Sequence, residues 1–317
     1  MINPRIAFFG SPFLAAECLK ALVNNFEMPM AVTRPDRPRG RGKKLTAPEV
    51  KQAAEQYGIA VYQPVGIDSR MVREFEKYGI ELVVVVAYGK ILPGEVIHFP
   101  VYGTLNLHPS LLPRHRGASP VEAAILSGDS STGITLQLMG EQMDQGDILA
   151  WKEIPVDKAT TAEQLLARVI EISPSFLVNS IKRYLEGELK PIKQDHSNAT
   201  YCPRIRKKDG LINWEQDSNT ICRKIKAYNV WPVAFSYLDA KVLKIYDAEP
   251  LPDQEAGGSM PGEIVEAGRN QGLLVKASDG LVGVLEVQLE NKKRMDFQKF
   301  INGYRNLQGK ILSSGLN

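Results

Sequence analysis

Residues 82–87, Leu-Val-Val-Val-Val-Ala, constrain the fold more than any other stretch of the chain. All six residues are apolar and four of them are β-branched, which is typical of a central strand buried on both faces of a sheet. Residues 6–9, Ile-Ala-Phe-Phe, form a second run without a polar side chain. Strands of this kind belong to parallel sheets that are covered by helices on both sides. The sequence therefore predicts an α/β domain with a mostly parallel sheet.

Strand and helix patterns alternate through the first part of the chain, as expected of such a domain. Gly10 ends the first strand, and we expect Ser11 to be the N-cap and Pro12 the first residue of the following helix. The other predicted strands are 30–33, 59–62, 82–87, 104–108, 133–139 and 148–154, and the other predicted helices are 48–57, 69–78, 120–126 and 161–186.

Two polar residues with chemical potential lie at the end of the predicted strand 104–108. Asn106 and His108 are two residues apart, so their side chains project from the same face of that strand. Pro109 ends the strand, which places the pair at the carboxyl edge of the sheet, where α/β proteins usually bind ligands. An amide and an imidazole can both donate hydrogen bonds to a developing oxyanion. Either residue alone could equally cap a loop.

Three further blocks accompany this pair in a fixed order: Ser110-Leu111-Leu112-Pro113, Arg116-Gly117 and Met143-Asp144-Gln145-Gly146-Asp147. In order and spacing, these blocks resemble the folate-dependent formyltransferases, a family that includes the glycinamide ribonucleotide and methionyl-tRNA formyltransferases. The resemblance implies a Rossmann-like formyltransferase domain, here assigned to residues 1–189, and 10-formyltetrahydrofolate as the co-substrate.

The resemblance also implies the roles of three catalytic residues. Asn106 and His108 would donate to the formyl oxygen as negative charge develops on it. Asp144 would lie near His108, favour its protonated form, and help to remove the amine proton, directly or through water. Asp144 could otherwise be a turn residue, and Asp147 is interpreted as structural. A direct acyl transfer of this kind needs no covalent intermediate, which fits the absence of a reactive Cys or Ser motif.

Two loops are expected to hold the folate by the same resemblance. Pro109 and His115 stand where relatives often have Gly and an aromatic residue, and His115 is interpreted as a packing or loop residue. The predicted folate-binding residues are Ala87, Tyr88, Gly89, Ile91, Leu92, Ser110, Leu111, Leu112 and Pro113.

Residues 34–45 form an unusual loop that carries six Lys or Arg residues between Pro and Gly. It is about double the usual length of about 2–6 residues for a connection in an α/β unit. It could be a solvated surface loop, but its length and single-sign charge favour an arm that contacts phosphates. Methionyl-tRNA formyltransferases have a similar basic insertion, which enters the acceptor-arm region of the initiator tRNA. The predicted tRNA-binding residues are Arg37, Arg39, Arg41, Lys43, Lys44, Arg206, Lys207 and Lys208.

The chain changes character after residue 189. Residues 190–209 are polar and contain several basic residues, and they are interpreted as a basic linker. Residues 210–317 contain short strand patterns separated by turn signals, which predict a small β-barrel. The resemblance implies an OB-like barrel that helps to bind tRNA. Lys292, Lys293 and Arg294 could belong to that contact or to a solvated end. The expected strands are 234–238, 242–246, 262–266, 272–277 and 283–289.

Composition limits the other possibilities. The chain has 317 residues, a formal net charge of +3, and three widely spaced cysteines, which argue against a disulfide framework and for a reducing compartment. No cluster has metal-ligand spacing, and no segment has the character of a signal peptide or membrane span. We therefore expect a cytoplasmic protein, a monomer, without a metal ion or a membrane partner.

The sequence as a whole predicts an enzyme that transfers a formyl group from 10-formyltetrahydrofolate to the α-amino group of methionyl-initiator tRNA. One alternative is a formyltransferase acting on a small amine, such as a sugar nucleotide or glycinamide ribonucleotide; the basic loop and the barrel argue against it. Another is a non-catalytic RNA-binding protein that has kept this fold; the intact set of Asn106, His108 and Asp144 argues against it.

Overall fold

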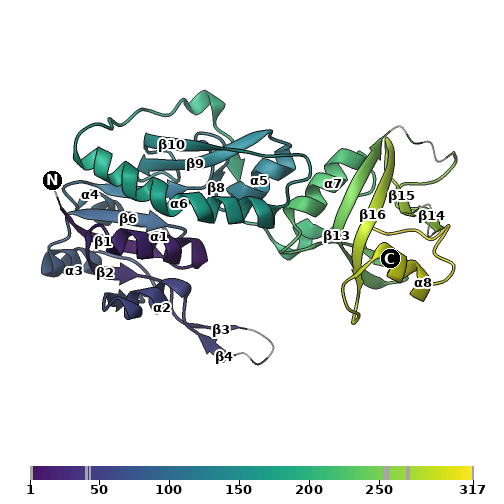
Figure 1. Ribbon diagram of the computed structural model, residues 1–317, viewed down its shortest axis with the longest axis horizontal. Helices are drawn as coiled ribbons and strands as arrows, with labels where there is room; N and C mark the ends of the chain where they lie inside the picture. The colour runs from purple at the N-terminus through teal and green to yellow at the C-terminus, as the bar shows by residue number, and fades with distance from the viewer. Residues whose placement is uncertain are drawn as a thin grey trace. The chain divides into compact units, whose positions relative to one another are not determined.

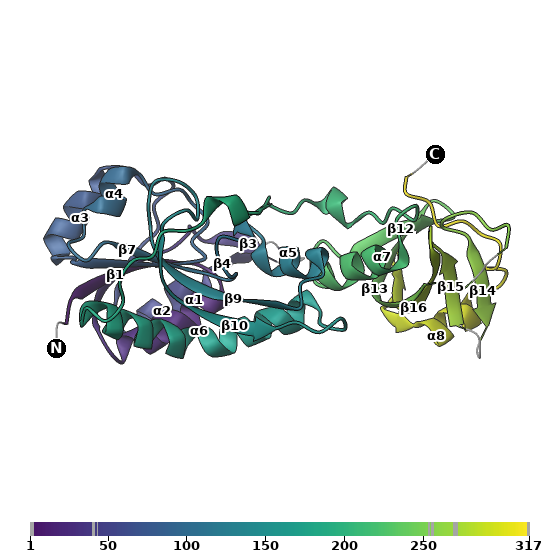
Figure 2. The same ribbon diagram turned by 90° about the horizontal axis from the view of Figure 1, so that it is seen from above.

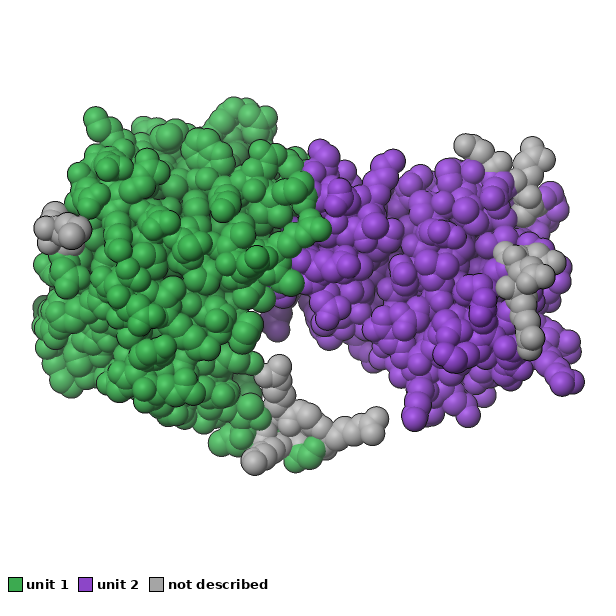
Figure 3. All heavy atoms as spheres, in the orientation of Figure 1, with its two compact units in different colours: residues 1–120, 131–155, 167–203 green, residues 121–130, 156–166, 204–317 purple. Residues whose placement is uncertain are grey.

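A computed structural model describes residues 3–39, 42, 44–252, 254, 257–268 and 272–315. The chain divides into two compact units, coloured separately in Figure 3. The first contains residues 1–120, 131–155 and 167–203, and the second contains residues 121–130, 156–166 and 204–317. Residues 190–203 thus belong to the first unit. The domain limits predicted from the sequence, with a linker at 190–209, stay a prediction.

The first unit is built on a seven-stranded sheet with the order β10-β9-β7-β6-β1-β2-β5 (Figure 1). The strand predicted to be central, β6, is fully buried and pairs in parallel with both β1 and β7. β2 and β5 continue the parallel pairing, whereas β9 and β10 are antiparallel to their neighbours. The mostly parallel sheet is therefore confirmed. The strands are β1 (Arg5–Gly10), β2 (Glu27–Val32), β5 (Ala60–Tyr62), β6 (Leu82–Val86), β7 (Thr104–His108), β9 (Ser131–Leu138) and β10 (Asp147–Pro155).

Helices cover both faces of this sheet, as the apolar strands require. Figure 2 shows α3 and α4 on one side of the sheet and α1 and α6 on the other. On the first side, Val83 and Val85 of β6 share a buried cluster with Phe75 of α3 and Ile97 of α4. The helices of the first unit are α1 (Phe13–Val23), α2 (Glu49–Gln56), α3 (Arg70–Tyr78), α4 (Gly94–His98) and most of α6 (Ala162–Leu185). α5 (Pro120–Ser127) belongs almost wholly to the second unit.

The predicted start of the first helix is wrong in detail. α1 begins at Phe13, and Pro12 occupies the N-cap position without a side-chain cap. The Ser11 hydroxyl instead accepts hydrogen bonds from the Arg34 backbone N–H and the Thr33 hydroxyl, both at 3.2 Å. Ser11 therefore ties the end of β1 to the chain that follows β2, and this tertiary contact takes precedence over local capping.

The described part of the basic loop forms a hairpin. β3 (Arg37–Arg39) pairs antiparallel with β4 (Lys44–Thr46), with Arg37 opposite Thr46. The described part of the loop is thus a two-stranded hairpin, and the pairing of β3 with β4 limits the conformations that these strands can adopt.

The second unit contains an antiparallel sheet with the order β12-β13-β16-β15-β14, and β17 pairs with β16. Near the C-terminus, Ser313 bridges to Tyr237 of the edge strand β12, and Ile311 bridges to Glu263 beside the other edge strand β14. The C-terminal segment therefore connects the two edges of the antiparallel sheet. The elements are β12 (Ala234–Leu238), β13 (Lys241–Pro252), β14 (Ile264–Gly268), β15 (Gly272–Lys276), β16 (Gly280–Leu289), β17 (Met295–Asp296), α7 (Ser218–Ala227) and α8 (Phe297–Gly303).

Trp214 is the largest side chain in the core of the second unit, and its loss is expected to be costly. The residue is 2% exposed, and its indole N–H donates to the Ser236 hydroxyl at 3.1 Å. We expect Trp214→Ala to lower the free energy of unfolding of this unit by about 3–5 kcal/mol, because it leaves a cavity in the core and removes the hydrogen bond to the Ser236 hydroxyl. Urea denaturation of the full chain measures this, with Trp231→Ala as a control because Trp231 is 55% exposed. Equal losses of unfolding free energy in the two variants would contradict the placement of Trp214 in the core.

Candidate functional site

The end of β7 carries two of the predicted catalytic residues. Because β7 lies between β6 and β9, Asn106 is opposite Val85 on one side and Gln137 on the other. Asn106 is half-buried, and His108 is 5% exposed. Because β9 is antiparallel to β7, its last residue, Leu138, lies opposite Leu105 near the start of β7, and residues 139–146 then connect β9 to β10.

Asp144 in that loop lies beside both residues. Its Oδ1 atom accepts from Gln137 Nε2 at 3.1 Å and, more weakly, from Asn106 Nδ2 at 3.4 Å. The same oxygen lies 3.6 Å from His108 Nδ1, which is too long for a hydrogen bond. Oδ2 accepts from the Gly117 backbone N–H at 2.8 Å. The structure thus brings Asn106, His108 and Asp144 together from two separate segments.

The orientation of the His108 ring is determined by a residue that the sequence marked only as packing. His108 Nε2 lies 2.9 Å from the backbone carbonyl of His115. A carbonyl can only accept, so Nε2 carries a proton and Nδ1 is the nitrogen that faces Asp144. Any second proton on the ring is therefore held at Nδ1, next to the carboxylate.

The backbone around Asp144 is held in a conformation that most residues avoid. Asp144 has φ 54° and His115 has φ 56°, both in the left-handed region. Gly117, which donates to the Asp144 carboxylate, has φ 120° and lies in β8 (Arg116–Gly117), paired with β11 (Tyr201–Cys202). Strain of this kind persists where the surrounding contacts determine the local geometry.

Gly117 should not tolerate a side chain. A Cβ atom added there would lie 2.2 Å from the Cys202 carbonyl oxygen, in addition to the unfavourable φ. We expect Gly117→Ala to destabilise the first unit by about 1–3 kcal/mol and to lower turnover, because the N–H that binds Asp144 moves with the backbone. Thermal unfolding and steady-state kinetics measure the two effects. Gly66→Ala is the control, because no atom lies within 4 Å of a Cβ built there; similar effects in both variants would argue against this explanation.

The loop after β6 was predicted to hold folate, and its side chains divide into two groups. Tyr88 and Leu92 are buried in the core, and the Tyr88 ring packs edge-on against Phe9 with a centroid distance of 5.3 Å. Burial raises the pKa of Tyr88 to about 12. Ala87, Gly89 and Ile91 are exposed, and Ile91 is 81% exposed. Only the second group presents side chains or uncovered backbone to a ligand.

Residues 110–113 show a similar division. The Ser110 side chain is fully buried and donates to the Arg114 carbonyl at 2.6 Å, while its own carbonyl accepts from the Thr135 hydroxyl at 2.6 Å. Leu112 is buried as well, whereas Leu111 and Pro113 are half-buried. Ser110 therefore stabilises the turn, and the more accessible Leu111 and Pro113 are left as its ligand-facing candidates.

Comparison with known proteins identifies the family of this chain. The Formyl transferase family model matches residues 4–181, and the model of the Formyl transferase C-terminal domain matches residues 204–305. Methionyl-tRNA formyltransferase from Syntrophus aciditrophicus is 40% identical and covers 98% of this chain and 100% of its own length. The enzyme of that name from Citrifermentans bemidjiense is 38% identical, covering 98% of this chain and 97% of its own.

The chain belongs to the methionyl-tRNA formyltransferase family. The membership inferred from the motifs is thereby confirmed.

Solved structures share the fold at lower identity. An N-formyltransferase from Helicobacter canadensis, in complex with folinic acid and dTDP-3-aminofucose, superposes with a TM-score of 0.67 at 17% identity and covers 92% of this chain and 100% of its own. HypX from Aquifex aeolicus, in complex with tetrahydrofolic acid, has a TM-score of 0.62 at 20% identity. The match covers 95% of this chain and 47% of HypX.

The predicted tRNA-binding residues of this formyltransferase are described only in part. Arg37 is exposed at the base of the hairpin, and Arg206, Lys207 and Lys208 are exposed at the 3-10 helix Lys207–Gly210. Arg41 and Lys43 lie outside the described residues, as do the side chains of Arg39 and Lys44. The role of all eight residues in binding tRNA stays a prediction.

Sequence reasoning missed two glutamines that contact Asp144. Gln137 could have been found from the strand pattern, because antiparallel pairing of β7 with β9 places it opposite Asn106. Gln194 could not, because it follows α6 in a polar stretch with no recognisable pattern. Its Nε2 atom donates to the backbone carbonyls of Asp144 at 2.9 Å and Gly146 at 2.6 Å.

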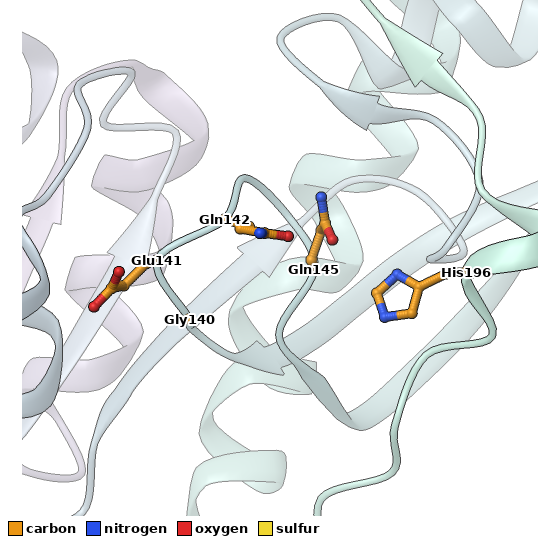
Figure 4. Close-up of a pocket in the computed structure, with 5 residues that line it drawn as sticks. All are labelled: Gly140, Glu141, Gln142, Gln145 and His196. Carbon is orange, nitrogen blue, oxygen red and sulfur yellow. The ribbon is translucent and has the colours of Figure 1, made fainter.

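A pocket of about 370 Å³ adjoins the loop that carries Asp144 (Figure 4). It is lined by Gly140, Glu141, Gln142, Gln145 and His196. Figure 4 shows the His196 ring on the same side of the loop as the Gln145 amide. The lining includes neither Asn106, His108 nor Asp144, so the pocket adjoins the loop rather than the three predicted catalytic side chains.

Other kinds of site find little support in the described part of the chain. No group of three or more His, Cys, Asp or Glu residues there could hold a metal ion. Cys18 and Cys222 are buried, and burial raises the pKa of each thiol to about 12, which leaves almost no thiolate near neutral pH. Neither is poised as a nucleophile. None of the helices that the structure describes is long and apolar enough to cross a membrane.

Proposed function

We propose that this protein transfers the formyl group of 10-formyltetrahydrofolate to the α-amino group of methionyl-initiator tRNA. The observation that carries the proposal is the convergence of Asn106, His108 and Asp144 at the carboxyl end of β7. The identity of 38–40% to methionyl-tRNA formyltransferases over nearly the whole chain supports the choice of tRNA as the acceptor.

The reaction requires a neutral amine and a place for negative charge. A free α-amino group has a pKa of about 7.7–8.0, so a useful fraction is neutral at pH 7. Attack on the formyl carbon moves negative charge onto its oxygen, and preorganised N–H donors stabilise that charge. A site with an amide, an imidazole and a carboxylate supplies both the donors and a proton acceptor.

The geometry supports particular atoms for these roles. One Asn106 Nδ2 hydrogen faces Asp144, which leaves the second hydrogen for the formyl oxygen. His108 would donate through Nδ1, because Nε2 is bound to the His115 carbonyl. Asp144 would hold the proton at Nδ1 and accept the proton that leaves the amine, directly or through water.

The candidate folate site has the character that a flat, partly apolar ring requires. Ile91 offers an exposed apolar side chain, and Leu111 and Pro113 are half-buried beside the turn that follows β7. Exposed backbone at Ala87 and Gly89 could pair with the polar edge of a pterin. Bound there, 10-formyltetrahydrofolate would supply the activated formyl group.

A direct assay tests the proposal. The purified protein is mixed with 10-formyltetrahydrofolate and one of three acceptors: methionylated initiator tRNA, methionylated elongator tRNA, or a small amine such as an amino sugar nucleotide. We expect rapid formylation of the initiator tRNA and much slower reaction of the other two. Faster formylation of the small amine would favour the small-molecule alternative, and absence of all transfer would refute the enzyme.

A further inference from the structure

Behind Asp144, on the side of its main chain, lies a buried pair of polar residues. Arg116 is 1% exposed and Gln194 is 6% exposed. The Arg116 guanidinium donates to Gln194 Oε1 from Nη2 at 2.7 Å and from Nε at 3.2 Å. Gln194 Nε2 in turn donates to the carbonyls of Asp144 and Gly146. A continuous chain of hydrogen bonds thus connects Arg116 to the peptide group of Asp144.

The guanidinium is unusual because its partners are uncharged within the described part of the chain. Besides Gln194, it donates to the Tyr201 hydroxyl at 3.0 Å and to His196 Nδ1 at 3.2 Å. Burying a cation without a carboxylate partner costs free energy. The hydrogen bonds of the Arg116 guanidinium to its neutral partners must therefore offset this cost. Donation to the oxygen of an amide also polarises its N–H groups and strengthens the bonds they make.

We propose that Gln194, polarised by Arg116, is the positioning residue that holds Asp144 in its catalytic orientation. Asp144 has φ 54°, a left-handed conformation that relaxes unless its peptide is held. The side chain of Asp144 is fixed by Gln137 and Gly117, and its main chain by Gln194. Without Gln194, the peptide can rotate and carry the carboxylate away from His108.

Gln194→Glu separates positioning from simple stability. The glutamate keeps an acceptor for Arg116, as an ion pair, but it replaces the donating amide with an oxygen that faces two carbonyls. Gln194→Met removes both functions and leaves the buried guanidinium without its main partner. We therefore expect the Tm of Gln194→Glu to stay close to that of the wild type, and the Tm of Gln194→Met to fall.

Although Gln194→Glu should keep a Tm close to that of the wild type, we expect it to lose activity. This expectation rests on the proposed function, so kcat is measured for formylation of methionyl-initiator tRNA. We expect Gln194→Glu to lower kcat by about 10- to 100-fold, the usual effect of misplacing a catalytic group by about 1 Å, with KM for both substrates within about threefold. Asn198→Ala is the control, because this exposed residue in the same segment bonds to Asp195 and not to Asp144.

A kcat of Gln194→Glu within twofold of the wild type, with full loss only in Gln194→Met, would overturn the proposal and leave Gln194 as a partner of Arg116 alone. A crystal structure of Gln194→Glu provides a readout that does not need activity: we expect Asp144 to leave the left-handed region. An unmoved Asp144 would refute the positioning role. If the wild type does not formylate tRNA, the proposed function fails, and the structure of the variant still decides the positioning role.

Discussion

Replacement of Asp144 with asparagine is expected to lower kcat by at least about 10²–10³, the usual cost of removing one group from a preorganised catalytic site. The carboxylate accepts from Gln137 and Gly117 and faces His108 Nδ1. An asparagine at this position would direct its NH₂ group at the N–H groups that now donate to Asp144. Being neutral, it could neither hold a proton on His108 nor accept one from the amine. Single-turnover formylation of methionyl-initiator tRNA measures the chemical step directly.

Asp147→Asn is the matched control for this variant. Asp147 lies three residues further along, begins β10, and is paired opposite Leu138. We expect its kcat to stay within a few-fold of the wild type. Near-normal turnover in Asp144→Asn, with intact folding, would remove Asp144 from the mechanism and leave the two donors at the end of β7 to act alone.

Removal of three positive charges from the basic loop is expected to give the second large effect. We expect a combined Arg41→Gln, Lys43→Gln and Lys44→Gln variant to raise KM for methionyl-initiator tRNA by about tenfold or more, with little change in KM for 10-formyltetrahydrofolate. Each phosphate contact that is lost lowers the salt slope of binding by about 0.9, so three contacts would lower it by about 2.7. Titrations of tRNA at several salt concentrations measure both quantities.

The control for the loop replaces three exposed basic residues on the surface of helices: Arg73→Gln, Lys77→Gln and Lys182→Gln. This variant has the same change in net charge, so a long-range effect of charge would appear equally in both. If the loop variant and the helix variant bind tRNA alike, the loop is a solvated connection, and the phosphate contacts must lie elsewhere on the protein.

Much of this site could be predicted because its chemistry is encoded locally. Asn106 and His108 are on one strand, so the two-residue period alone places them on the same face. The buried character of Tyr88 and Ser110 could not be predicted in this way. Both stand in segments expected to bind folate. The Tyr88 ring turns inwards against Phe9 of β1, and the Ser110 hydroxyl turns inwards to the Arg114 carbonyl, in a turn whose backbone is bound by Thr135 of β9.

The sequence by itself determined the parallel sheet, the position of the polar pair at its edge, and membership of the family, because apolar periodicity and motif spacing are properties of short stretches of chain. Only the tertiary structure decided which atoms face one another at the candidate site. It showed that His108 presents Nδ1, because Nε2 is taken by the carbonyl of His115. It also brought Gln194 to the backbone of Asp144 across 50 residues of sequence. Such contacts depend on where distant segments meet, and no local pattern carries that information.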